Sequence, residues 1–184
     1  MSTDPVKLGY LFAEIVSGHD VSRFDEIVAP GYVNHNAFAE PGPEGVKKVF
    51  GAIIAGIPDL TVSAEDVLVS ADGSRLVGRY RYQGTHTGNF LGYPATGNAF
   101  TMRSIDIWRV EDGRFIEHWD ELNTLDFFTQ IGSTVSPTKG SVVFWHSLTK
   151  DGRHDLMSMH GACPTVHGVK WGATISEVIF SMIQ

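Results

Sequence analysis

The stretch Gly84-Thr-His-Thr-Gly-Asn-Phe-Leu-Gly-Tyr-Pro-Ala-Thr-Gly97 lies between two strand-like segments and determines how they are joined. It holds four glycines, a proline and a histidine, but no run long enough for a helix. Glycine adopts backbone angles that side chains exclude, and it allows another backbone to approach closely. The stretch therefore predicts a shaped loop between two long strands of one curved sheet, at the rim of a cavity. An ordinary surface connection with common turn chemistry is the alternative.

Four strand-like segments surround this loop, two before it and two after it. They are residues 60–70, 75–84, 99–110 and 114–122. Ala71-Asp-Gly and Glu111-Asp-Gly separate the members of each pair and read as turns. These segments predict antiparallel strands.

Helical spacing of apolar residues dominates the chain before residue 60. It predicts one helix from Pro5 to Gly18, a short one over 21–28, and a third from Pro43 to Gly56. A last apolar face after Leu122 predicts a helix that ends at Gly132. Helices followed by antiparallel strands predict an α+β fold in which the helices cover one face of a curved sheet.

Composition limits the classes of partner and compartment. The chain has 184 residues, 42% of them hydrophobic and 19% charged, with a net charge of −7. An acidic balance without a cluster of Lys and Arg argues against nucleic acid as a partner. The single cysteine, Cys163, excludes an internal disulfide. Because no apolar run approaches 18 residues and no signal-like start is present, we expect a cytoplasmic protein with no membrane partner.

The composition changes at Ser133-Thr-Val-Ser-Pro-Thr138, which resembles a linker. We therefore expect a first domain over residues 1–132 and a linker over 133–140. A separate, strand-rich segment follows over 141–184.

The hairpin at 111–113 decides which polar side chains meet. If its loop has three residues with Gly113 left-handed, Val110 faces Arg114. Two pairs then share one face of the sheet: Ser104 opposite Asp120, and Asp106 opposite His118. A two-residue loop would shift the register and separate these pairs.

The opposite face of this hairpin carries Ile105, Ile107, Phe115 and Trp119. If the polar face lines a pocket, its desolvated carboxylates and histidine are suited to general acid–base chemistry. Alternatively the polar face meets water and the apolar face forms the core, which the pattern by itself favours.

Other candidate site residues are His35, His86, Tyr80 and Tyr82. His35 lies between Asn34 and Asn36 in a segment without regular structure, where a histidine usually makes surface hydrogen bonds. We expect His86 to hold the glycine-rich loop through a backbone hydrogen bond. The sequence contains no nucleophile elbow, P-loop or dinucleotide fingerprint.

Motifs over residues 1–132 resemble the SnoaL-like polyketide cyclase family of the NTF2-like superfamily. They are Asn34-His-Asn, Pro43-Glu-Gly, Ile57-Pro-Asp-Leu, Gly84-Thr-His-Thr-Gly-Asn-Phe-Leu-Gly, Pro94-Ala-Thr-Gly, the run from Ile105 to Asp120, and Gln130-Ile-Gly. The resemblance implies an NTF2-like cone, in which a curved antiparallel sheet wraps around three N-terminal helices, and a homodimer.

The same resemblance implies a reaction. Characterised cyclases use an aspartate on the last strand as acid and base for an intramolecular aldol closure of a small hydrophobic carbonyl compound, without metal or cofactor. Asp120 matches that aspartate. The sequence departs from the family at Asp106, where those cyclases carry histidine, and at Ser104.

We accordingly assign Asp120, Asp106 and His35 as catalytic candidates. Substrate-binding candidates are Asn34, Tyr82, His86, Ser104 and His118. A non-catalytic small-molecule-binding or dimerisation module of the same fold is the alternative function.

Residues 136–175 resemble the end of a prolyl 4-hydroxylase, an iron- and 2-oxoglutarate-dependent dioxygenase. The run from His160 to Thr174 carries the resemblance, which implies His160 as an iron ligand and Lys170 as the residue that binds 2-oxoglutarate. An iron facial triad also needs a His-x-Asp, and His118-Trp119-Asp120 is the one present. This gives a third hypothesis, an iron oxygenase. An incomplete, non-catalytic fragment is the interpretation that the missing preceding strands favour.

Overall fold

The computed structural model describes residues 4–36, 39–90 and 92–132. In chain order the helices are α1 (Pro5–Gly18), the short 3-10 turn η1 (Val21–Arg23), α2 (Phe24–Ile27), α3 (Gly42–Gly56) and α4 (Thr124–Gln130). The strands are β1 (Val28–Asn34), β2 (Thr61–Val69), β3 (Arg75–Thr85), β4 (Ala99–Glu111) and β5 (Arg114–Leu122). This confirms the predicted α+β fold. The predicted linker and the segment over 141–184, with His160 and Lys170, lie outside the described residues.

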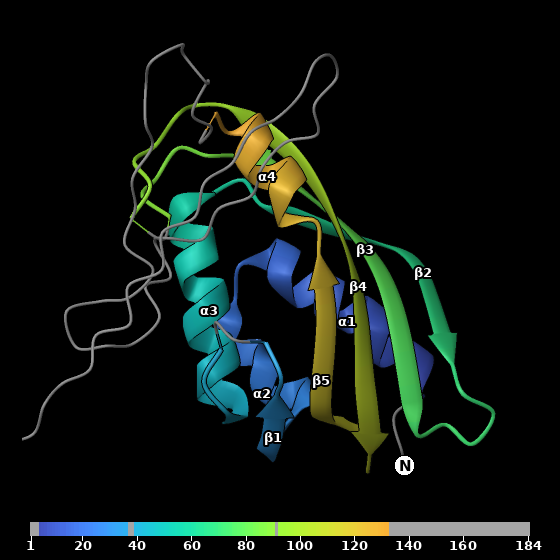
Figure 1. Ribbon diagram of the computed structural model, residues 1–184. Helices are drawn as coiled ribbons and strands as arrows, with labels where there is room; N and C mark the ends of the chain where they lie inside the picture. Colours follow the sequence, from blue (N-terminus) through green and yellow to red (C-terminus); the bar gives the residue numbers. More distant parts are fainter. Residues whose placement is uncertain (1–3, 37–38, 91, 133–184) are drawn as a thin grey trace, which may run out of the picture.

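The strands form one sheet in the order β1-β5-β4-β3-β2, in which β1 is parallel to β5 and the other pairs are antiparallel. Figure 1 shows the sheet curving around α1, with α3 beside β1. The arrangement is that of an NTF2-like cone. No helix in the described part of the chain has the length and hydropathy that a membrane crossing requires.

Strand β1 was not predicted, and the predicted helix over 21–28 ends before Val28, where β1 begins. The segment contains Pro30 and Gly31, which weaken strands and are tolerated at a sheet edge. Its register with β5 is interrupted between Val28 and Val33, as expected of an irregular edge strand. Because the segment lies at the edge of the sheet, it can form a strand although it contains Pro30 and Gly31.

Helix α1 packs its apolar face against the inner face of the sheet. The Asp4 side chain accepts a hydrogen bond from the Val6 amide and caps the helix, and Pro5 occupies the first turn as predicted. The Phe12 ring lies 5.1 Å from the Tyr80 ring and 5.3 Å from the Trp108 ring, centroid to centroid. The core thus lies between α1 and strands β3 and β4.

The glycine-rich loop joins β3 to β4 and docks on the end of α3. The amides of Thr87 and Gly88 both donate to the Gly56 carbonyl oxygen. A Cβ atom on Gly88 would lie 2.2 Å from the Ala55 carbonyl oxygen, so this close approach requires glycine. His86 closes the loop with its backbone, because its amide donates to Asn98 and its carbonyl accepts from Thr96 and Gly97.

Candidate functional site

The turn between β4 and β5 has two residues, Asp112 and Gly113, both with positive φ (49° and 72°). The predicted three-residue loop is therefore wrong, and so are the predicted pairs. Asp106 lies opposite Asp120 in the ladder. His118 lies opposite Trp108.

A β-bulge restores the shared face that a two-residue turn alone would have lost. Val110 pairs with Phe115 but Arg109 pairs with Glu117, which leaves Ile116 as the extra residue on β5. Beyond the bulge, His118 and Asp120 point to the same side of the sheet as Asp106. Before it, Phe115 points to that side as well and is buried, so its predicted place beside Ile105 and Ile107 is wrong.

Burial shows which face is inside. Ser104 and Asp106 are each 2% exposed and His118 is 8% exposed, whereas Ile105 and Ile107 on the opposite face are exposed. The polar face therefore turns toward the helices. The interpretation that the pattern alone favoured, with this face in water, is wrong.

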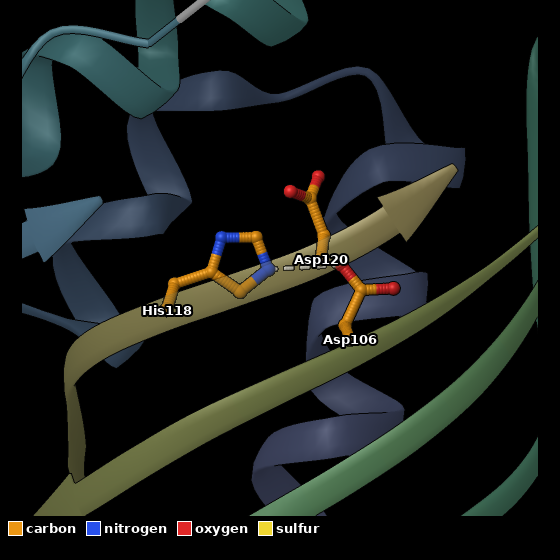
Figure 2. Close-up of side chains that lie close together, drawn as sticks. All are labelled: Asp106, His118 and Asp120. Atoms are coloured by element: carbon orange, nitrogen blue, oxygen red, sulfur yellow. Dashed lines mark hydrogen bonds and ion pairs between the residues drawn. The ribbon is translucent and has the colours of Figure 1, made fainter. Parts of the chain in front are cut away.

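Asp106 and His118 form a hydrogen-bonded pair inside the sheet. Figure 2 shows their side chains and that of Asp120 gathered together from neighbouring strands. His118 Nε2 lies 2.9 Å from Asp106 Oδ1, and the Ser104 hydroxyl donates to Asp106 Oδ2 over 2.5 Å. The Asp106 carboxyl is therefore bound on both oxygens.

The amide of Asn34 fixes a proton on His118. Asn34 Oδ1 accepts from the Asn36 backbone amide at 3.0 Å, so this atom is the oxygen of the side chain. His118 Nδ1 lies 3.2 Å from the same oxygen and must therefore carry a proton to bind it. It follows that Nε2 and Asp106 Oδ1 have one further proton to share, held by one or the other.

Asp120 is half-buried and has its own partner, because Asn36 Nδ2 donates to its Oδ2 over 2.7 Å. Burial raises the pKa of Asp120, and the Asp106 carboxyl adds to this effect. The hydrogen bond from Asn36 and the nearby His118 lower the pKa of Asp120 and so act in the opposite direction.

Burial also raises the pKa of the Tyr32 and Tyr82 hydroxyls above their ordinary value, which keeps both as hydrogen-bond donors.

One oxygen or nitrogen atom of each of Asp106, His118 and Asp120 lies within 4.8 Å of the others, a spacing that a divalent cation can also use. A cation would have to displace the hydrogen bond between His118 and Asp106. The cluster supplies one histidine from the described residues. The iron hypothesis depends on His160, which lies outside them.

Tyr82 belongs with this cluster, whereas the two other histidine candidates do not. Tyr82 is buried on the inner face of β3, where its hydroxyl contacts the Ser104 side chain and lies near the carboxyls of Asp106 and Asp120. His86 is fully buried in the loop, with Nδ1 3.2 Å from the Thr96 hydroxyl and Nε2 without a hydrogen-bond partner in the described structure. His35 stacks on Trp119 and contacts Glu117 on the outer face. The structure therefore brings together six of the predicted residues and leaves His35 outside this group. The six are Asn34, Tyr82, Ser104, Asp106, His118 and Asp120.

Asn36 contacts Asp120 but was absent from the predicted site. The signal available in the sequence was its position two residues after Asn34, which puts both amides on one side of an extended segment. A surface groove of about 440 Å3 is lined by residues such as Asp59, Thr61, Gln83 and Gln130 and does not include this cluster. The chemistry of the cluster, rather than the size of that groove, marks the candidate site.

The sequence matches the family model of SnoaL-like polyketide cyclase over residues 8–131. The chain belongs to the SnoaL-like polyketide cyclase family. TsrD and IdmH are among the solved structures that are similar to it. TsrD from Streptomyces laurentii is 31% identical with a TM-score of 0.65, and the match covers 70% of this chain and 94% of TsrD. IdmH from Streptomyces antibioticus, a proposed polyketide cyclase, is 29% identical with a TM-score of 0.61, over 71% of this chain and 99% of IdmH.

A second likeness is confirmed over a short segment. The chain is 46% identical over 44 residues to prolyl 4-hydroxylase subunit alpha-2 of Caenorhabditis elegans, and 43% identical over the same length to subunit alpha-1 of Homo sapiens. These matches cover 24% of this chain but only 8% of each hydroxylase subunit. Iron and 2-oxoglutarate therefore remain a prediction for this protein.

Proposed function

We propose that this chain is a cofactor-free enzyme that uses Asp120 as acid and base on a small hydrophobic carbonyl compound. The observation that carries the proposal is a half-buried carboxylate beside a buried, proton-sharing Asp106–His118 pair. Membership of the SnoaL-like family supports cyclisation as the class of reaction. Desolvated groups that share a proton are suited to general acid–base chemistry.

The aldol closure uses these groups in sequence. The Asp120 carboxylate removes a proton from the carbon next to a carbonyl group, which leaves an enolate. His118 Nε2 then exchanges its hydrogen bond to Asp106 for one to the enolate oxygen, which stabilises the charge of the enolate. The enolate carbon then bonds to a second carbonyl carbon of the same molecule, and protonated Asp120 returns its proton to the new alkoxide.

Replacement of Asp120 by Asn tests this assignment. The amide in Asp120→Asn keeps the shape of the side chain, and its oxygen can still accept the hydrogen bond from Asn36, but it cannot take up a proton. We expect turnover to fall by at least about 100-fold, as typical for loss of a general base, while circular dichroism stays unchanged.

Glu121→Gln is the matched control, because this exposed neighbour on β5 points to the opposite face. Wild-type turnover in Asp120→Asn would contradict the proposed role. If neither wild type nor variant turns over any carbonyl substrate that binds, the non-catalytic binding module is the better function.

We also propose a homodimer formed through the outer face of the sheet. Two neighbouring rows on this face run in register across β3, β4 and β5. One row is Arg79, Ile105 and Glu121, and the other is Val77, Ile107 and Trp119. Ile105 and Ile107, at the centres of the two rows, are both exposed, and neighbouring apolar side chains are costly to leave in water.

The charges of these rows favour a second copy as the partner. A two-fold axis along β4 would place β3 of one copy over β5 of the other. Arg79 then faces the Glu121 side chain of the second copy, and Ile107 faces its own equivalent.

A further inference from the structure

Residues 34–36 leave the end of β1 with their side chains alternately on the two faces of β5. Asn34 pairs with His118 in the parallel ladder, and the His35 amide donates to the His118 carbonyl at 3.0 Å. The Asn34 and Asn36 side chains reach the inner face, where they contact His118 and Asp120. The His35 ring lies between them in sequence but on the outer face.

His35 is fastened to the outer face by two kinds of contact. Its ring stacks on Trp119 with centroids 4.8 Å apart and an interplanar angle of 7°. Its Nε2 lies 3.0 Å from Glu117 Oε1, and the other oxygen of Glu117 accepts from Arg109 Nε at 2.9 Å. Trp119 also lies 5.3 Å from the Arg75 guanidinium carbon. The partners of His35 are thus themselves held in place.

We propose that His35 is a positioning residue: from the outer face of β5 it holds Asn34 against His118 and Asn36 against Asp120. The inference rests on the proposed function in one respect, that the enzyme uses Asp120 as acid and base. The positioning of Asn34 and Asn36 does not depend on it. The contacts of the segment support it, because its inner side chains bind the site and its one outer side chain binds the sheet.

The role of His35 differs from that of a catalytic residue. Its ring cannot reach a substrate bound at Asp120, since the β5 backbone separates the two faces. What it controls is the distance between Asn36 Nδ2 and the Asp120 carboxylate. That hydrogen bond lowers the pKa of Asp120 against the effect of burial, so loosening the segment raises the pKa.

The experiment is a carboxyl NMR titration of Asp120 in the full chain, labelled with 13C aspartate. Wild type is compared with His35→Ala, His35→Phe and Asn36→Ala, with Leu68→Ala as the control because Leu68 is exposed on the outer edge of the sheet. We expect the titration midpoint to rise in Asn36→Ala and to rise in the same direction in His35→Ala. The midpoint in His35→Phe returns most of the way to wild type, since phenylalanine keeps the stacking on Trp119.

A midpoint in His35→Ala equal to wild type, or one that phenylalanine does not restore, would overturn the inference. So would an Asn36→Ala midpoint that does not move. Turnover is measured separately: we expect His35→Ala to lower kcat several-fold with little change in KM. Unchanged turnover in Asp120→Asn would reject the proposed function but leave the titration result intact, so the two failures are distinguishable.

Discussion

At the scale of single residues, the site depends on which atoms carry protons. Asn34 presents its side-chain oxygen to His118 because the Asn36 amide already binds that oxygen. Ser104 and His118 then hold both oxygens of Asp106. Asp120 has one neutral donor, Asn36, and remains the carboxyl most available to a ligand.

The raised pKa of Asp120 has a consequence for stability. A carboxyl whose pKa is higher in the folded than in the unfolded state opposes folding once it ionises. This cost is absent below the unfolded pKa, grows as the pH rises from the unfolded to the folded pKa, and is constant above the folded pKa. We therefore expect Asp120→Asn to have a higher Tm than wild type at pH 7, with the gain shrinking toward pH 3. Thermal unfolding at several pH values measures it, and an equal Tm difference at all pH values would contradict it.

At the scale of elements, the close packing of the glycine-rich loop on α3 is the most constrained contact. Gly88→Ala would bring a Cβ atom against the Ala55 carbonyl, and we expect a loss of about 1–3 kcal/mol in the free energy of unfolding. Gly51→Ala is the matched control: it lies within α3 with open space around its Cα, and should gain about 0.5–1 kcal/mol. Denaturant titration of both variants checks this. Equal effects would mean that the loop is not packed as described.

The sequence predicted the elements better than their register. Proline and glycine mark the ends of α1 and α3, and alternation marks β2 to β5, so these were confirmed with small changes at the ends. The bulge at Ile116 was not predictable, because it depends on how β5 packs in three dimensions. Asn36 was missed for a related reason. Its spacing from Asn34 puts the two amides on one side, but its partner Asp120 is 84 residues away in the sequence.

At the scale of the whole molecule, the outer face of the sheet and the inner cluster belong to the same strands. If the proposed dimer pairs Arg79 with Glu121 of a second copy, charge reversal has a specific signature. We expect Arg79→Glu to weaken dimerisation about tenfold and the double variant Arg79→Glu/Glu121→Arg to recover most of it.

Light scattering coupled to size-exclusion chromatography at several protein concentrations measures the equilibrium between monomer and dimer. Recovery in the double variant would support the two-fold arrangement along β4. A single mass that none of these substitutions changes would contradict it. Tyr10→Ala serves as the control here, since Tyr10 is exposed on α1 and lies away from the outer face of the sheet.

The single extra residue in β5 has a consequence for the kinds of mutation that this strand can accept during evolution. Because Ile116 sets whether the following side chains point inward, deleting one residue between Arg114 and Glu117 would exchange the two sides of the strand at once. Trp119 and Glu121 would then enter the interior, while His118 and Asp120 would meet the solvent. Point substitutions in this strand therefore change one side chain at a time, whereas an insertion or deletion there would disrupt the inner cluster and the proposed dimer face in one step.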